Sequence, residues 1–401
     1  MSRGFIPYGG YWSTPFAKWQ GALSHLHSLR LAAHTATAAL AARGIPADAF
    51  DHGILGTTVP QRNAFYGLPW VAGMIGAPGI GGPTINQACA TSARMVQVAS
   101  QEIAGGTATC VLLIAADRTS NGPHIYYPAP GAPGGTGEAE NWVLDNFGHD
   151  PFAGLSMVET AENVAARWRI DTAAQHAVVL MRDAQYRDAL ADDRAFQRRY
   201  MVPVALPDAA FRRTIGTLEA DEGVFPTTAE GLGKLKPVRP EGTVTFGGQT
   251  HPADGNAGMV VTTKALARDL SRDPGIAVEL LGFGQARAET GFMPAAPVPA
   301  ARRALDDAGV TIADVDAVKS HNPFAVNDIV FAAETEFPLE RMNNYGCSLI
   351  WGHPQGPTGL RAMIELIEEL ALRGGGVGLF QGCAAGDTGM AVVLRVTDGR
   401  P

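Results

Sequence analysis

The sequence has few charges and few cysteines for its length, and each scarcity excludes a class of protein. Only 17% of the residues are charged, and the net charge of −8 is opposed by no basic cluster, which argues against nucleic acid or an anionic membrane as a partner. The four cysteines show no metal-type spacing, so neither a metal site nor a disulfide scaffold is expected. No signal peptide and no apolar run of membrane-spanning length is apparent, and we expect reduced thiols in a cytoplasmic protein.

The chain is long and apolar enough for a large globular enzyme. Its 401 residues are 46% hydrophobic, which suffices for two or three cores of ordinary domain size. The last third of the sequence repeats the first, because in both a helix that ends at glycine precedes a short strand, twice over. In the first third, a helix at 29–43 precedes a strand at 52–56, and the helix after Cys89 precedes a strand at 108–116. In the last third, a helix at 298–309 precedes a strand at 316–320, and a helix at 357–372 precedes a strand at 378–381. Two such halves predict a layered α/β fold.

The middle of the chain departs from this pattern. Residues 121–155 are rich in proline, glycine and aromatic side chains and form an excursion from the sheet, and loops of that length are usually functional. Helices are expected at 157–167 and 172–190. Residues 242–248 are expected to return the chain to the sheet, and 247–255 to form a turn.

Cys89 lies between a predicted strand and the first turn of a predicted helix. Unpaired amide hydrogens and the positive end of the helix dipole favour the thiolate there, and the thiolate is the nucleophilic form of cysteine. The alternative is a small buried apolar residue, which is what most lone cysteines in intracellular proteins are. Cys110, inside an apolar strand, is expected to belong to the core.

Three further stretches lie where predicted strands end or helices begin. They are His321-Asn322-Pro323-Phe324 after a strand, Gly352-His353-Pro354 before a helix, and Cys383-Ala384-Ala385-Gly386 at the end of the last strand. Taken singly, each has a structural alternative: a surface histidine, a helix cap and a packed thiol. In layered α/β folds, however, sites form where strand ends meet.

Taken together with Cys89-Ala90-Thr91, these stretches resemble the motifs of the thiolase family, in the family's order. The resemblance extends to flanking segments, including Thr160–Ala165 and Gly356–Arg361. It implies the thiolase fold, in which two similar halves pack as a five-layer αβαβα core with an inserted loop domain. The implied divisions are an N-terminal half at 1–120, a loop domain at 121–245, the return of the first half at 246–270 and a C-terminal half at 271–401.

The resemblance also implies a set of roles. Cys89 is expected to form the acyl-enzyme, His353 to take its proton, and Cys383 to exchange protons with the coenzyme A thiol or the nucleophilic carbon. One oxyanion site would be formed by His321 with His353, and the other by the backbone amides of Cys89 and of the loop near Gly389. Residues expected to line the substrate and coenzyme A site are Met157, Thr250, Met293 and Phe324, although core packing is the alternative for the two methionines.

The implied activity is acyl-CoA C-acyltransfer, namely cleavage of a 3-oxoacyl-CoA by coenzyme A or the reverse Claisen condensation. Coenzyme A would be a substrate, with no bound cofactor and no metal. Two alternatives stay open: a condensing synthase with an unusual acceptor, and a non-catalytic subunit that binds acyl-CoA. The resemblance further implies a homodimer or homotetramer, and some branches of the family also pair with a small OB-fold or zinc-ribbon protein.

The chain departs from the family pattern around the acyl group. His321 replaces an asparagine, Ala385 replaces a glycine, and no basic residue stands at Phe225 before proline. Together with the aromatic excursion at 121–155, these departures favour a bulky or aromatic 3-oxoacyl-CoA, because each buried CH₂ contributes about 0.8 kcal/mol. The competing interpretation is that the excursion packs against a neighbouring subunit.

Overall fold

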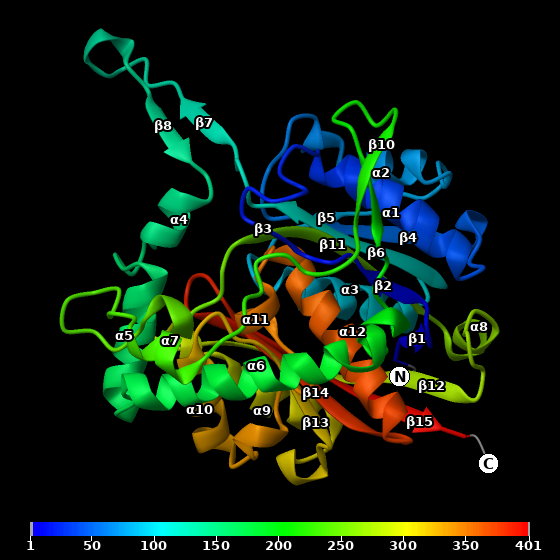
Figure 1. The fold of residues 1–401 in the computed structure, drawn as a ribbon. Helices are drawn as coiled ribbons and strands as arrows, with labels where there is room; N and C mark the ends of the chain where they lie inside the picture. Colours follow the sequence, from blue (N-terminus) through cyan, green and yellow to red (C-terminus); the bar gives the residue numbers. More distant parts are fainter. Residues whose placement is uncertain (1–2, 400–401) are drawn as a thin grey trace.

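The computed structural model describes residues 3–399, and within them eleven strands form one sheet that joins two halves (Figure 1). The strands of the first half are β1 (Phe5–Pro7), β2 (Tyr11–Ser13), β3 (Ala17–Lys18), β4 (His52–Gly56), β5 (Thr84–Ile85), β6 (Cys110–Arg118) and β11 (Ala253–Thr262). Those of the second half are β12 (Ile276–Arg287), β13 (Ala317–His321), β14 (Gly375–Ala384) and β15 (Thr388–Asp398). Strand β1 pairs with both β11 and β12 and so connects the halves.

The two halves share one strand topology. In the first, β4 is parallel to β6, and β6 is antiparallel to β11. In the second, β13 is parallel to β14, and β14 is antiparallel to β15. The internal repeat expected from the sequence is therefore present in the fold.

Helices separate and cover the two parts of the sheet. The helices of the halves are α1 (Ser28–Ala42), α2 (Gly67–Met74), α3 (Thr91–Gly105), α8 (Lys264–Asp269), α9 (Pro297–Ala308), α10 (Ala325–Thr335), α11 (Ser348–Trp351) and α12 (Gly356–Leu372). Helices α1 and α2 cover the outer face of the first half, α9 and α10 cover that of the second, and α3 and α12 lie between the two parts of the sheet (Figure 1). This is the five-layer αβαβα arrangement.

Strand β6 shows why the layers form. Val111 and Leu113 point into the core beside α3 and α12, whereas Leu112 and Ile114 point into the core beneath α1 and α2. A strand that is buried on both faces has a continuous run of apolar residues, and that run predicts this strand from the sequence.

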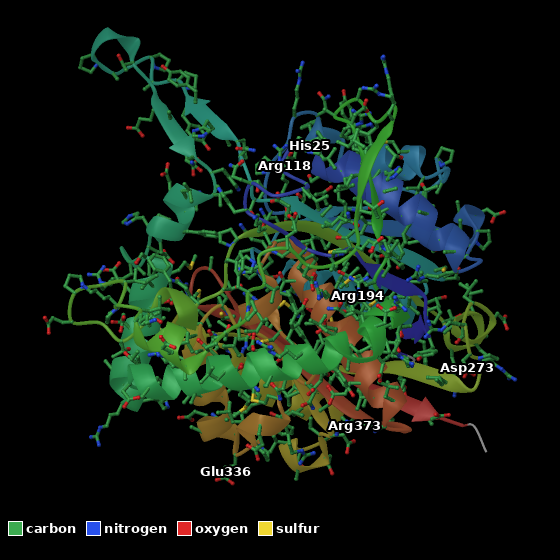
Figure 2. The ribbon with its side chains drawn as sticks, in the orientation of Figure 1. His25, Arg118, Arg194, Asp273, Glu336 and Arg373 are labelled. Carbon is green, nitrogen blue, oxygen red and sulfur yellow. The ribbon has the colours of Figure 1, made fainter. Side chains whose placement is uncertain are left out.

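The central helix α12 is buried along its length although it carries charges. Arg361 makes two hydrogen bonds with Asp221, of 2.6 and 2.8 Å, and Glu365 pairs with Lys319 at 3.0 Å. Buried charges are tolerated when paired and hydrogen-bonded. By contrast, the exposed side chains of Glu336 and Arg373 lie at the rim of the molecule (Figure 2).

The segment between β6 and β11 is an insertion that packs mainly on the second half. Its elements are the hairpin β7 (His124–Tyr127) and β8 (Glu138–Asn141), the hairpin β9 (Val204–Pro207) and β10 (Thr214–Leu218), and the helices α4 (Leu144–Gly148), α5 (Met157–Trp168), α6 (Thr172–Arg194) and α7 (Ala229–Gly233). Helix α6 packs against α10 and α11. The β7–β8 hairpin projects away from the body of the molecule (Figure 1).

The strand predicted at 242–248 is wrong. The Thr243 and Val244 amides donate hydrogen bonds of 2.9 Å to the Glu162 carboxylate, so they do not join a strand ladder. The sheet instead resumes with β11 at Ala253, inside the predicted turn. Gly255 lies in that strand, and the position needs glycine because a Cβ there would come within 2.4 Å of the Phe16 ring. No helix among residues 3–399 has both the length and the apolarity needed to cross a bilayer.

Candidate active site

The turn that carries Cys89 lies between β5 and α3, as the sequence predicts. The Thr91 hydroxyl holds this turn, because it accepts a hydrogen bond from the Gln87 amide at 2.9 Å and donates one to the Ala88 carbonyl at 2.7 Å. Ala88 has a φ of +45°, which few residues other than glycine adopt. Cys89 is partly exposed, whereas the other three cysteines are buried free thiols.

His353 is the immediate partner of the Cys89 thiol. Its Nε2 lies 3.2 Å from Cys89 Sγ, and its Nδ1 lies 2.6 Å from the Thr358 hydroxyl in the first turn of α12. The Thr358 contact fixes the ring so that Nε2 faces the sulfur. Gly352 (φ +92°) is required before His353, because a Cβ there would approach His251 Nε2 to 2.7 Å.

At neutral pH the pair consists of a thiol and a neutral imidazole. Burial raises the pKa of Cys89 to about 12, although the amides of Ala385 and Cys89 itself favour the thiolate. Burial, with His321 and His251 nearby, holds the pKa of His353 well below its usual range. Desolvation therefore opposes the thiolate form that the helix N-terminus favours. His353 Nε2 is the base within hydrogen-bonding distance that could accept the Cys89 proton.

His321 stacks on His353, with ring centroids 4.0 Å apart and an interplanar angle of 26°. Its Nδ1 lies 3.0 Å from the Ser348 hydroxyl, while its Nε2 is buried with no hydrogen-bond partner in residues 3–399. Burial lowers the pKa of His321 to about 3, so the ring is neutral. An unpaired buried nitrogen beside the thiol is suited to hydrogen-bond a substrate oxygen.

Cys383 lies at the end of β14. The Asn327 side-chain amide donates a hydrogen bond to its sulfur at 3.3 Å, and burial raises the thiol pKa far above its usual range. Cys383 and Cys89 line one cavity of about 200 Å³ together with His353. A protonated thiol facing the same space as the nucleophile can act as a general acid there.

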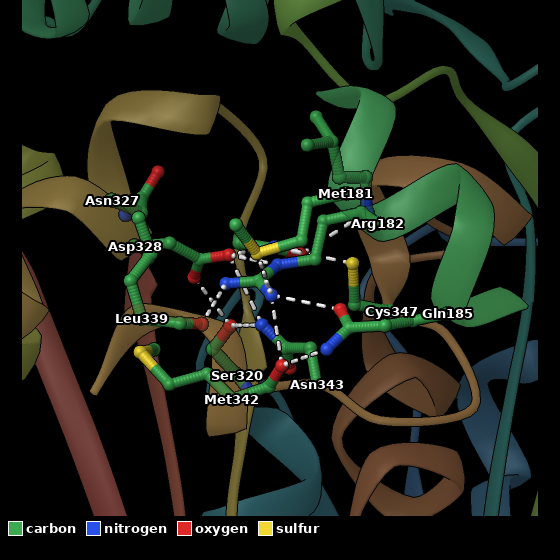
Figure 3. Close-up of polar contacts among 12 residues, drawn as sticks. Met181, Arg182, Gln185, Ser320, Asn327, Asp328, Leu339, Met342, Asn343 and Cys347 are labelled. Carbon is green, nitrogen blue, oxygen red and sulfur yellow. Dashed lines mark hydrogen bonds and ion pairs between the residues drawn. The ribbon is translucent and has the colours of Figure 1, made fainter. Parts of the chain in front are cut away.

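A buried polar network surrounds Asp328, and Ser320, the neighbour of His321 in the sequence, belongs to it (Figure 3). The Asp328 carboxylate accepts hydrogen bonds from Arg182 Nε at 2.9 Å, from the Ser320 hydroxyl at 2.8 Å and from Asn322 Nδ2 at 2.8 Å. Arg182 comes from α6 of the insertion, so the insertion supports the backbone that carries His321. The backbone N–H of Asn322 in turn donates to the Ser348 hydroxyl at 3.1 Å.

The four residues expected to contact substrate come together. Met157, Thr250, Met293 and Phe324 all line the 200 Å³ cavity of Cys89 and Cys383. The Thr250 amide donates to the Pro323 carbonyl at 2.7 Å, which fixes this wall beside the second motif. Their contacts with a substrate stay a prediction.

Gly389 is not placed as expected. It lies in β15 opposite Cys383 and Ala286, and a Cβ on it would come within 2.6 Å of the Ala296 carbonyl. The loop amide that hydrogen-bonds the Cys89 sulfur belongs to Ala385. Residues 388–398 form β15, so Gly389 lies in a strand and not in the loop that precedes it.

Sequence reasoning missed the residues that position the reacting groups. Asp117, at the end of β6, accepts hydrogen bonds from the Thr58 amide at 2.8 Å and from the Gly356 amide, at the start of α12, at 2.9 Å. It therefore ties the His353 loop to the first half of the molecule, and burial raises its pKa to about 6. The sequence signal that could have identified Asp117 is an acidic residue directly after the apolar run of β6. Thr358, Ser348 and Asn327 left no such signal.

Within residues 3–399, Cys89, His321 and His353 also form a group that could hold a metal ion. One donor atom from each lies within 4.8 Å of the others. The Cys89 and His353 donors already contact each other as an acid and a base, however. The arrangement accounts for proton transfer without further groups.

The two buried neutral histidines, His321 and His353, make the free energy of unfolding depend on pH. Their folded-state pKa values are depressed, so below the unfolded pKa of about 6.5 the unfolded chain binds protons that the folded chain does not. Stability is thus fully present above pH 6.5 and should fall by up to about 1.4 kcal/mol per pH unit for each histidine as the pH drops toward 3. We expect His321→Asn to lose less stability than the wild type between pH 6.5 and 4.5 in urea unfolding. The exposed His124→Asn serves as control, and parallel pH profiles for wild type and H321N would contradict the assignment.

Comparisons with known proteins cover the whole fold. The family descriptions "Thiolase, N-terminal domain" and "Thiolase, C-terminal domain" match residues 11–265 and 275–396. An acetyl-CoA acetyltransferase of Chromobacterium violaceum is 30% identical over 95% of this chain and 97% of its own length. The human mitochondrial 3-ketoacyl-CoA thiolase is 28% identical over 96% of both chains.

Solved structures agree with these matches. The human mitochondrial 3-ketoacyl-CoA thiolase in complex with CoA superposes with a TM-score of 0.89 at 26% identity, over 98% of both chains. The Bacillus anthracis acetyl-CoA acetyltransferase has the same fold, with a TM-score of 0.90 at 24% identity over 99% of both chains. Because the family descriptions span both halves and these relatives match nearly end to end, the chain belongs to the thiolase family of acyltransferases.

Proposed function

We propose that the protein catalyses the cleavage of a 3-oxoacyl-CoA by coenzyme A, or the reverse Claisen condensation, through a thioester on Cys89. The observation that carries this proposal is the 3.2 Å contact between Cys89 Sγ and His353 Nε2, with Cys383 in the same cavity. Family membership and the names of the relatives support it. A second thiol beside the Cys–His pair favours this reaction over a condensing synthase or a non-catalytic subunit.

In the first half-reaction His353 takes the Cys89 proton while the sulfur attacks the 3-oxo carbon. The oxyanion that forms is placed to accept hydrogen bonds from the amides of Cys89 and Ala385. When the bond between C2 and C3 breaks, its electron pair passes to C2, and the Cys383 thiol gives its proton to that carbon. Acetyl-CoA leaves, and the remaining acyl group is bound to Cys89.

In the second half-reaction the Cys383 thiolate takes the proton of the incoming coenzyme A thiol. The coenzyme A sulfur attacks the acyl carbon, and the Cys89 sulfur departs and regains its proton from His353. Both cysteines and the histidine end as they began, so protons and electron pairs balance. His321 Nε2, in the tautomer that carries the proton, would stabilise the thioester oxygen of the acetyl group when C2 is an enolate.

The CoA side of the substrate is assigned to the 200 Å³ cavity. Met157, Thr250, Met293 and Phe324 line it together with Cys383, which must reach C2. The CoA complex of the human relative is consistent with a coenzyme A substrate. Four free cysteines suit a reducing cytoplasm, and we propose that location.

The acyl tail is proposed to be bulky. A second cavity of about 360 Å³ also meets Cys89, and Trp142 and Phe147 belong to its walls. We expect kcat/KM for CoA-dependent cleavage to be at least about tenfold higher for benzoylacetyl-CoA than for acetoacetyl-CoA, because the ring buries several carbons more than a methyl group. Spectrophotometric loss of each 3-oxoacyl thioester measures this. A tenfold preference for acetoacetyl-CoA would end the bulky-tail proposal while leaving the thiolase reaction intact.

The projecting β7–β8 hairpin is proposed to serve assembly and not catalysis. Its Tyr126 and Tyr127 are 60% and 47% exposed, and the cavity wall begins only at Trp142. We expect light scattering to give a mass at least twice that of the 42.0 kDa chain. Replacing 124–141 by a short Gly-Ser linker should reduce the assembly without changing the preference between benzoylacetyl-CoA and acetoacetyl-CoA. A wild-type monomer at micromolar concentration would refute this.

A further inference from the structure

The two cavities that meet at Cys89 take different parts of the substrate. Cys383 and His353 line only the first, whereas Cys89 lines both. The carbon that bonds to the Cys89 sulfur carries C2 with the CoA on one side and the acyl tail on the other. Because C2 must face Cys383, the tail has to enter the second cavity.

The walls of the second cavity are more polar than those of the first. They are formed partly by residues 142–151, anchored where Trp142 Nε1 donates to the Thr58 carbonyl at 2.8 Å. Asp150 places a carboxylate on this wall, and none of the residues that line the cavity, all within the described chain, is Lys or Arg. A negatively charged tail would therefore meet the Asp150 carboxylate with no Lys or Arg to pair with, and His149 is the one lining residue that could offset the repulsion.

Gln355 is a buried polar side chain in the lining of this cavity. It is only 8% exposed, and its Oε1 lies 3.0 Å from the Thr58 hydroxyl, whose single proton is shared with Asp117 Oδ2 at 2.9 Å. Its backbone has a φ of +59°, an unfavourable conformation for a residue with a side chain. The Gly356 amide, held by Asp117 at 2.9 Å, maintains it.

One edge of the Gln355 amide is thus committed and the other is not. Its other edge makes no hydrogen bond within residues 3–399, and Gln355 belongs to the lining of the second cavity together with Cys89. That edge is open to a hydrogen bond with a group on the acyl tail. An apolar tail would leave it unpaired.

We propose that Gln355 makes the tail cavity selective for neutral acyl tails that carry a hydrogen-bonding group such as a hydroxyl. This inference rests on the proposed 3-oxoacyl-CoA reaction and names its substrate class. Thr58 and Asp117 act as positioning residues, because they hold the amide and its backbone and do not themselves contact the tail.

The test compares three aryl substrates of nearly equal shape: benzoylacetyl-CoA, its 3-hydroxyphenyl analogue and its 3-carboxyphenyl analogue. A meta hydroxyl scarcely alters the electrophilicity of the ketone, so differences in kcat/KM report recognition of the tail. We expect the hydroxyl compound to exceed the unsubstituted one by about three- to tenfold, the range of one neutral hydrogen bond. The carboxylate compound should be the poorest.

Two variants connect this preference to the amide. Gln355→Leu should bring the ratio of kcat/KM for the hydroxyl compound over the unsubstituted one down to about one, and Thr58→Val should lower it partly. Gln249→Leu makes the same replacement in the first cavity and should leave the ratio unchanged. Because the ratio is internal to each protein, losses of stability or overall rate do not alter it.

The outcomes separate the inference from the reaction on which it rests. A wild-type ratio at or below one, a preference for the carboxylate compound, or a ratio that Gln355→Leu leaves intact overturns the role of Gln355. Cleavage of acetoacetyl-CoA without any cleavage of the three aryl compounds overturns the tail cavity. Failure to cleave every thioester, including acetoacetyl-CoA, overturns the proposed function instead.

Discussion

Cys89→Ala is expected to lower kcat for 3-oxoacyl-CoA cleavage by roughly 10⁴-fold or more, because no other group is placed to form the acyl-enzyme. Cys383 faces the same cavity but contacts Asn327 and not His353. Initial-rate measurements with coenzyme A in excess test this expectation.

Cys110→Ala is the matched control. Cys110 is a buried thiol at the opposite end of β6 from Asp117. Its removal should cost stability as any small core truncation does, while kcat stays within a few-fold of the wild type. Loss of activity in both variants alike would show that thiol removal acts through folding, and residual activity of Cys89→Ala above about 1% would exclude Cys89 as the nucleophile.

His353→Ala should have the second largest effect, a decrease of about 10³-fold in kcat, within the usual range for loss of a general base. The wild-type thiol needs this base because burial raises the pKa of Cys89 to about 12. Without the base, attack must await the rare free thiolate. The rate of H353A should therefore rise nearly tenfold per pH unit from pH 7 to 9, whereas the wild-type rate changes little.

Alkylation of Cys89 by iodoacetamide at each pH, followed by peptide mapping, measures this pH dependence independently of turnover. His124→Asn, at an exposed histidine of β7, serves as the control. Equal alkylation profiles in H353A and the wild type would argue against His353 as the proton acceptor.

The fold was predictable because its signals are local and repeated. The apolar run of β6, the glycine that follows α1 and the amphipathic pattern of α12 each mark an element, and their recurrence in the last third indicates two like halves. The structure then brings the motif residues together by symmetry, since Cys89 precedes α3 and His353 precedes α12 at equivalent places in the repeat.

What could not be predicted depends on contacts between distant segments. The 242–248 segment has the composition of a strand, but Glu162 from α5 takes its amides. Gly389 resembles a loop residue until the register of β15 is known. The protonation state of Cys89 depends on burial by residues from both halves, which a dipole argument from its own helix omits.

The tail cavity shows the same limit. Gln355 follows the His353 motif in the sequence, but the contacts that position its side chain come from Thr58 and Asp117, which lie far from it in the sequence. The sequence predicts a single excursion at 121–155, whereas the structure divides it into a projecting hairpin and a wall of the cavity that begins at Trp142. We propose substrate contact for the wall and assembly for the hairpin.

The central claim is the acyl-enzyme on Cys89, and intact-mass spectrometry with peptide mapping tests it most directly. Wild-type protein is mixed with acetoacetyl-CoA or benzoylacetyl-CoA without free coenzyme A, quenched in acid and digested. The account predicts one acetyl or benzoyl adduct per chain, on the peptide of Cys89, which disappears when coenzyme A is added before the quench. An adduct confined to Cys383, or rapid CoA-dependent cleavage with no adduct on Cys89 at any time, would contradict it.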